Sequence, residues 1–400
     1  KNKPYIYRVS TVFHFWGQHM LTRGRHVHGS LLGGTAAPSL PPRMHSSRIR
    51  VQCRSSSPSI HNPALLPSFL GSSFQVPPIG LGLAALGRPG YINLGHDRAI
   101  RAKTVEDMKQ QSWEVLDTAY ELGVRYFDAA RSYGMAEDFL SSWLEKRGLE
   151  PSQCLVGSKW GYYYTAGFKV DTGGQPHEIK DHSRSRLEDQ SAKSNQLLGS
   201  HLNLYQIHSA TLESGVLQSK EVLEGLEQLS KEKGWRIGLS LSGPKQADTL
   251  KAAMNVRTSD GQPLFSAVQA TWNLLEQSAG DALLEAKQAG MEIIVKEGLA
   301  NGRLAGVNPD PGFVPKQSLL SNVAQSYNTT VDALALAVVL SQQFKPMVLS
   351  GACTVDQLRS NMQAIDLASR LREHDIESLQ SLLKQDADFY WGERSALPWN

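Results

Sequence analysis

Four residues with complementary acid–base chemistry follow three apolar segments, each of which ends abruptly in a polar residue. Asp128 and Tyr133 lie in FDAARSYG, Lys159 in VGSKWG and His208 in LYQIHSA. A lysine ammonium beside a phenol favours the phenolate and lowers the tyrosine pKa, and an aspartate can hold that ammonium in place. A histidine can donate a hydrogen bond to a carbonyl oxygen. Together the four residue types predict a proton-donor site for reducing a carbonyl group.

Alternating strand and helix patterns must position these residues. From about residue 74, short β-rich runs alternate with amphipathic helical runs. Strands are predicted over 79–86, 125–130, 154–161, 202–208, 236–242, 265–273, 291–298 and 346–352. Helices are predicted over 105–123, 136–148, 179–199, 219–234, 244–254, 280–290, 316–327, 331–343, 355–365 and 372–385.

This alternation predicts parallel strands joined by right-handed helical crossovers. Eight such units within residues 74–392 favour a (β/α)8 TIM barrel. The competing layout is a doubly wound open sheet, but no GxGxxG motif follows the first strand. Catalytic groups of a TIM barrel lie at the C-terminal ends of its strands, where Asp128, Lys159 and His208 are predicted. Any one of them alone is more often structural, since a Lys or Asp at the end of a strand usually forms a solvated ion pair, so the hypothesis depends on their combination.

The charge of the chain is unevenly distributed. No Asp or Glu precedes Asp97, and residues 1–70 hold nine Lys and Arg together with many Ser and Pro. This composition is typical of a chloroplast transit peptide, with a mitochondrial or cytoplasmic location as the alternatives. The other reading is a disordered tail, or upstream sequence if translation starts at Met20 or Met44. The rest of the chain is mildly acidic, so we expect no nucleic-acid partner.

Other classes of site receive little support from the sequence. Cys53, Cys154 and Cys353 are far apart and lack metal-ligand spacing, so we expect no metal site and see no reason to expect a disulfide. No run approaches the 18 apolar residues of a membrane helix, so no membrane partner is expected. The sequence does not indicate an oligomeric state.

From about Pro78 to Ile365 the chain resembles the aldo-keto reductase superfamily. FDAARSYGMAE is similar to the strand-two motif of that family, VGSKWG to its lysine motif and LYQIH to its histidine motif. The resemblance implies that Asp128, Tyr133, Lys159 and His208 are catalytic, with Tyr133 as general acid or base. It also implies direct hydride transfer between a nicotinamide and the carbonyl carbon of a small aldehyde, ketone or sugar.

The resemblance extends to cofactor-binding segments, with two departures. Leu241 stands where the family commonly has Asn, and Lys296 stands where it commonly has a Tyr stacked on the nicotinamide. The implied cofactor contacts are Ser240, Gln269, Lys296, Gly298, Leu299, Asn301, Gly302, Arg303, Gln357 and Asn361. The resemblance implies NADP as the cofactor. NAD is the alternative, because the Lys and Arg that the family often uses for a 2′-phosphate are absent. The departures resemble a divergent branch, and the N-terminal composition suggests a plant-type organellar member.

Two long loops are candidate walls of the substrate pocket. They are residues 160–178, in which Trp160 and Tyr162 to Tyr164 face either the pocket or the barrel rim, and residues 87–100. Two other functions stay open at this point. One is an NAD(P)-dependent sugar 1-dehydrogenase, and the other is a regulatory nucleotide-binding subunit of the kind that serves potassium channels.

Overall fold

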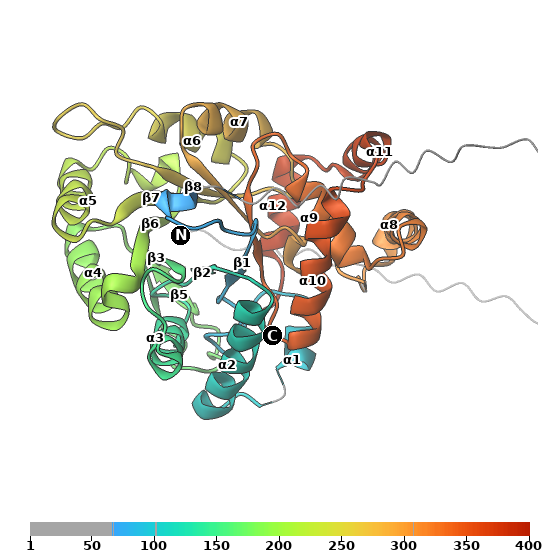
Figure 1. The fold of residues 1–400 in the computed structure, drawn as a ribbon, viewed down its shortest axis with the longest axis horizontal. Helices are drawn as coiled ribbons and strands as arrows, with labels where there is room; N and C mark the ends of the chain where they lie inside the picture. The colour runs from blue at the N-terminus through green and yellow to red at the C-terminus, as the bar shows by residue number, and fades with distance from the viewer. Residues whose placement is uncertain (1–65, 67, 101, 307) are drawn as a thin grey trace, which may run out of the picture. The chain divides into compact units, whose positions relative to one another are not determined.

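Parallel strands close into a barrel that is surrounded by helices (Figure 1). The structure is a computed structural model and describes residue 66 and residues 68–100, 102–306 and 308–400. Within them the barrel has eight strands in the closed order β1-β10-β9-β8-β7-β6-β3-β2. They are β1 (Ile79–Gly82), β2 (Tyr126–Asp128), β3 (Leu155–Trp160), β6 (Leu202–Ala210), β7 (Arg236–Leu241), β8 (Ala267–Thr271), β9 (Glu292–Lys296) and β10 (Met347–Ser350). The predicted TIM barrel is confirmed, and the open sheet is excluded because β1 pairs with β10.

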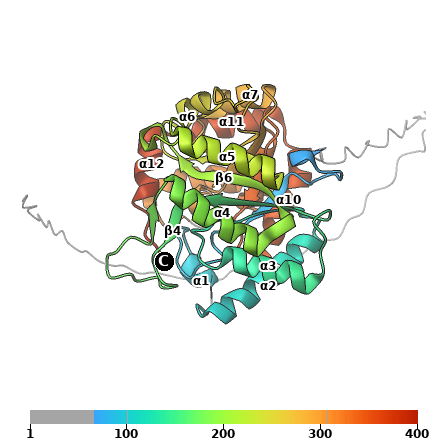
Figure 2. The same cartoon turned by 90° about the vertical axis from the view of Figure 1, so that its left-hand side faces the viewer.

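Helices cover the outside of this barrel (Figures 1 and 2). The crossover helices are α2 (Val105–Glu121), α3 (Ala136–Arg147), α4 (Arg184–Leu198), α5 (Lys220–Lys233), α6 (Gln246–Ala253), α7 (Gly280–Gln288), α9 (Val331–Leu340) and α10 (Val355–Ala368). The remaining ones are α1 (His96–Ala99), α8 (Val314–Ser326), α11 (Glu373–Leu383) and α12 (Ala387–Ser395). The sequence patterns predicted neither α1 nor α12. Among the described residues, no helix is long and apolar enough to cross a membrane.

Side-chain hydrogen bonds set where several helices begin. The hydroxyls of Thr104, Thr330 and Thr354 accept from backbone N–H groups in the first turns of α2, α9 and α10. The helix predicted from residue 179 instead begins at 184, after the N-cap Ser183. The residues before it form β5 (Glu178–Lys180), which pairs with β4 (Tyr162–Tyr164) in an antiparallel hairpin. This hairpin occupies the long loop that was predicted to border the pocket.

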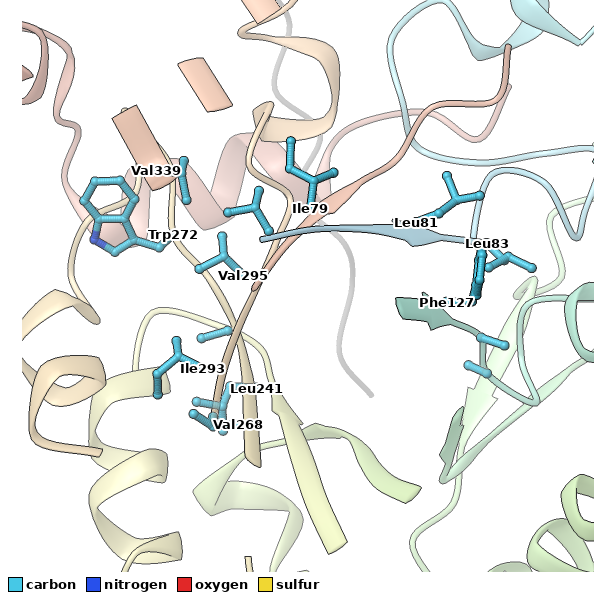
Figure 3. Close-up of a cluster of buried hydrophobic side chains, with 14 of the residues drawn as sticks. Ile79, Leu81, Leu83, Phe127, Leu241, Val268, Trp272, Ile293, Val295 and Val339 are labelled. Atoms are coloured by element: carbon cyan, nitrogen blue, oxygen red, sulfur yellow. The ribbon is translucent and has the colours of Figure 1, made fainter. Parts of the chain in front are cut away.

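Strand alternation separates two buried layers. Outward-facing residues such as Phe127, Val268 and Val295 join the large core between barrel and helices (Figure 3). Neighbouring positions such as Tyr126 and Ile294 belong to a second cluster. Because side chains alternate along a strand, Asp128 faces the same way as Tyr126, into the barrel. The interior therefore changes from apolar to polar along the barrel axis.

A short segment before β1 joins the apolar cluster that contains Tyr126. Phe69 and Leu70, which the sequence analysis assigned to the tail, are buried, and Phe69 packs edge-on against Tyr126. Leu66 forms a β-bridge with Val76, and the Arg236 guanidinium donates to the Leu70 carbonyl at 2.7 Å. The folded body therefore includes residues within the predicted 1–70 segment.

Candidate active site

Asp128 and Lys159 form a buried ion pair inside the barrel mouth. The Lys159 ammonium donates to Asp128 and, at 2.9 Å, to the Ala129 carbonyl. The other Asp128 oxygen accepts from Gln269 at 2.9 Å and from the Tyr126 hydroxyl at 3.2 Å. Gln269, one of the implied cofactor contacts, therefore donates to Asp128 in this structure. The donors leave the Asp128 carboxylate well satisfied although it is fully buried.

Tyr133 and His208 lie next to each other in front of this pair. The Tyr133 hydroxyl is 3.5 Å from Nε2 of His208, and the two rings meet edge-on. Nδ1 of His208 is 3.3 Å from the Ser132 hydroxyl. The Lys159 ammonium is 4.7 Å from the centre of the Tyr133 ring. The structure thus brings together all four residues that the sequence nominated as catalytic.

Burial dominates the proton affinities of these groups. Desolvation, assisted by Asp128, raises the pKa of Tyr133 well above its ordinary value. This direction is opposite to the expected lowering by Lys159. Burial likewise lowers the pKa of Lys159, against the opposing effect of Asp128. Burial and the nearby cations Lys159 and Arg88 lower the pKa of His208, which is therefore neutral at neutral pH. Tyr133 carries its proton there and can act as an acid.

A cavity of about 520 Å³ opens beside Tyr133 and His208. It extends past the loop after β9 to the start of α10. Its lining includes most of the residues expected to hold a cofactor, namely Gln269, Lys296, Gly298, Leu299, Asn301, Gly302, Gln357 and Asn361. The backbone has positive φ at Glu297, Ala300 and Asn301, an uncommon conformation for residues other than glycine. Such strain is concentrated where a binding site requires it.

Two expected cofactor contacts lie elsewhere. Arg303 does not line the cavity: its guanidinium donates to Glu393 at 3.1 Å and to the Ala300 carbonyl at 3.0 Å. Ser240 is also absent from the lining, because its hydroxyl accepts from the Ser209 N–H at 2.8 Å. In this structure both side chains bond to other groups of the protein itself.

Lys296 lies on the cavity wall within a charged cluster. Its ammonium donates to the Thr271 hydroxyl at 2.7 Å and is 4.0 Å from Glu297. Arg394 of α12 donates to both oxygens of Glu297. Burial lowers the pKa of Lys296 to about 8, whereas Arg394 and Lys296 hold the pKa of Glu297 at about 2 despite its burial.

Several cavity-lining residues were not nominated from the sequence. Arg88 and Tyr91 come from the loop after β1. The sequence predicts residues 87–100 as a pocket wall but singles out neither residue. Glu178 begins β5. Arg394 and Trp399 come from the C-terminal region. No spacing pattern links residues so distant in the chain. The available signal is local: an Arg among glycines and close to one aromatic residue, Tyr91, in GRPGYINLG.

The cavity fits an extended dinucleotide. It joins the proton donor Tyr133 to the loop after β9 and to the first turn of α10, whose N–H groups favour an anion. The Oδ1 atom of Asn301 is buried without a hydrogen-bond partner among the described residues. Buried polar atoms are rarely left unpaired, so this oxygen is suited to a ligand donor.

Comparisons with known proteins show which family this chain is similar to. Residues 78–384 match the Aldo/keto reductase family. The uncharacterized oxidoreductase YqkF of Bacillus subtilis is 28% identical over 305 residues, covering 70% of this chain and 89% of that protein. The aryl-alcohol dehydrogenase GME11368 of Pestalotiopsis microspora is 22% identical over 340 residues, covering 80% and 82%.

A solved structure shows the same fold. The holo form of the aldo-keto reductase AKR11C1 from Bacillus halodurans superposes with a TM-score of 0.59 at 20% sequence identity. The match covers 79% of this chain and 95% of that one. With the family match over most of the barrel, this chain belongs to the aldo/keto reductase family and is an NAD(P)-linked oxidoreductase.

Proposed function

We propose that this enzyme interconverts an aldehyde or ketone and the corresponding alcohol, with Tyr133 as general acid and base. The observation that carries the proposal is the contact of the Tyr133 hydroxyl with His208 at the end of the cavity, beside Lys159. A bound nicotinamide would supply the hydride for the carbonyl carbon. Tyr133 gives its proton to the carbonyl oxygen, and neutral His208 orients that oxygen through a hydrogen bond.

The buried ion pair has a supporting role in this scheme. Lys159 is held by Asp128 and the Ala129 carbonyl, so its charge has a fixed position relative to the phenol. When Tyr133 loses its proton, this cation stabilises the phenolate that remains. The arrangement therefore supports catalysis in both directions, with Tyr133 recovering its proton from the alcohol during oxidation.

For the cofactor, the residues support NAD(H) more than the expected NADP(H). Among the residues that the structure describes, the cavity lining near the start of α10 contains no Lys or Arg, whereas Asp332 contributes a carboxylate to it. In the orientation of the Asn361 side-chain amide that gives both its oxygen and its nitrogen a partner, the oxygen accepts from the Ser350 hydroxyl. The nitrogen then donates to the Asp332 carboxylate at 2.8 Å. A 2′-phosphate would meet neutral amides and one negative charge, without a guanidinium to pair with it.

For the substrate, two classes are supported by different observations. Tyr91, Tyr133 and Trp399 line the cavity, which suits an aromatic aldehyde, and one relative is named an aryl-alcohol dehydrogenase. Glu178 and Glu297 also line it, and such acceptors suit a hydroxylated sugar. We propose aryl aldehydes first and aldoses second. A panel of both, assayed in each direction with each cofactor, discriminates them through kcat/KM.

Replacing Tyr133 by Phe tests the proposed proton donor. The variant keeps the ring but loses the exchangeable proton, so turnover should fall by about 100-fold or more. Cofactor binding, measured by quenching of protein fluorescence, should be unchanged and serves as the control for folding. Turnover within about tenfold of the wild-type value would assign proton transfer to another group.

We also propose that residues 1–65 carry an organellar address, with the chloroplast as its destination and the mitochondrion as the alternative. The support is compositional, namely the absence of Asp and Glu and the abundance of Arg and Ser. These residues lie outside the described part of the structure. On the same compositional support, we propose that the chain belongs to a plant-type organellar branch of the family.

A further inference from the structure

Arg88 is a buried guanidinium packed against the proposed proton donor. Its side chain is 2% exposed, and its Cζ atom is 5.1 Å from the centre of the Tyr133 ring and 4.7 Å from that of Trp399. The Trp399 ring in turn stacks on His177, with centres 4.1 Å apart and planes within 3°. Three segments distant in the sequence therefore fix this cation beside the phenol.

Hydrogen bonds connect Arg88 to the backbone that carries Tyr133. Nη1 of Arg88 donates to the Ser132 carbonyl at 3.0 Å and to Glu178 at 2.9 Å. Ser132 directly precedes Tyr133, and its hydroxyl contacts Nδ1 of His208. Loss of the guanidinium would loosen the chain at the point that sets the Tyr133–His208 geometry.

The phenol is surrounded by charges of both signs. The ionisable groups around it are Asp128 and Tyr126 on β2, Lys159 on β3, Glu178 on β5, His208 on β6, Tyr91 and Arg88 in the loop after β1, and Glu297 after β9. Lys159 is already committed to Asp128. Arg88 is thus a second cation within about 5 Å of the ring, and its own counter-ion, Glu178, belongs to the hairpin.

We propose that Arg88 is a positioning residue for proton transfer at Tyr133, acting as a second cation whose effect on the phenol is moderated by Glu178. The inference rests on the proposed function of Tyr133. A cation favours the phenolate and a carboxylate disfavours it. In agreement, Arg88 acts to lower the pKa of Tyr133 and Glu178 acts to raise it, although burial is the larger effect.

The two charges predict shifts of opposite sign, which a purely structural role would not produce. The readout is the pH profile of kcat/KM for alcohol oxidation, whose rise reports conversion of Tyr133 to phenolate. Arg88→Gln should move this rise to higher pH, and Glu178→Gln should move it to lower pH. Each shift should be on the order of half a pH unit or more. Arg88→Lys keeps the charge and should stay closer to the wild-type profile than Arg88→Gln.

Arg186→Gln is the matched control. Arg186 also lies over a tyrosine ring, that of Tyr163 at 4.5 Å, but outside the cavity lining, so its loss should not move the profile. If Arg88→Gln does not fold by circular dichroism, Arg88→Lys and Glu178→Gln still decide the question.

The Tyr133→Phe variant tests the proposed function of Tyr133 separately from the proposed role of Arg88. A pH-dependent rise that survives in this variant would remove the proposed function of Tyr133. Loss of the rise in Tyr133→Phe, together with unshifted or same-direction profiles in the Arg88 and Glu178 variants, would overturn only the role of Arg88.

Discussion

The protonation of Tyr133 is the residue-scale property on which the chemistry depends most. Burial and Asp128 favour its neutral form, whereas Lys159 and Arg88 are placed to stabilise the phenolate. A protonated phenol beside a neutral His208 is ready to donate at neutral pH. We therefore expect carbonyl reduction to be the easier direction near pH 7 and alcohol oxidation to improve as the pH rises.

We expect the carboxylate of Asp332 to disfavour the binding of NADPH relative to NADH. Asp332→Asn removes the carboxylate from the end of the cavity near α10, so NADPH should bind more tightly while NADH binding changes little. Fluorescence titrations at low and high salt measure both dissociation constants. The gain for NADPH should be larger at low salt, where screening is weaker. Equal changes for the two cofactors would mean that the 2′-phosphate lies away from Asp332.

The lowered pKa of Lys296 predicts that the free energy of unfolding depends on pH. Its folded-state pKa of about 8 lies below the ordinary value of 10.5. Between these values the unfolded chain holds a proton that the folded chain has released, so stability rises with pH across this window. Below pH 8 both states are charged and the burial cost of the ammonium is fully present.

Lys296→Met should remove this rise and stabilise the protein most at neutral pH. Urea unfolding at several pH values between 7 and 10 measures the difference from the wild type. Lys287→Met is the control, because Lys287 pairs with Glu292 at 2.9 Å in a more exposed position. Parallel wild-type and Lys296→Met curves would show that Lys296 keeps an ordinary pKa in the folded protein.

At the scale of elements, the segment before β1 packs against the apolar cluster that contains Tyr126. Phe69→Ala should destabilise the fold by about 3 kcal/mol or more, because it leaves a cavity against Tyr126. Phe389→Ala is the matched control, since Phe389 is 56% exposed and its replacement should cost less than about 1 kcal/mol.

Deletion of residues 1–65 should leave thermal unfolding and turnover close to those of the full chain. A deletion through residue 76 that is equally stable would show that this segment is dispensable.

At the scale of the whole molecule, the chain combines a basic N-terminal segment with a mildly acidic remainder. Residues 1–70 hold nine of the 41 Lys and Arg and none of the 38 Asp and Glu. Fusions of a fluorescent reporter to segments starting at Met20 and at Met44 and ending at residue 65 should reach plastids or mitochondria in plant cells. A fusion with its Arg residues changed to Glu should fail to do so. Diffuse fluorescence from both unchanged fusions would count against an organellar address.

The sequence by itself determined the barrel and its four catalytic candidates. Alternating periodicities define parallel strand–helix units, and a TIM barrel collects strand ends at one mouth, so Asp128, Lys159 and His208 could be placed together without coordinates. Tyr133 followed because it lies in the same loop as Asp128. These inferences succeed because they depend on local pattern and on a fold with one regular geometry.

Only the tertiary structure decided which other side chains reach the cavity. Arg88, Glu178 and Trp399 meet although they are far apart in the chain, and their contacts depend on how irregular segments pack. Arg303 lies in the expected loop but pairs with Glu393 instead. The rise in the pKa of Tyr133 likewise comes from burial, which is a sum over the whole surroundings. Such properties arise from three-dimensional packing, which no spacing of residues in the sequence encodes.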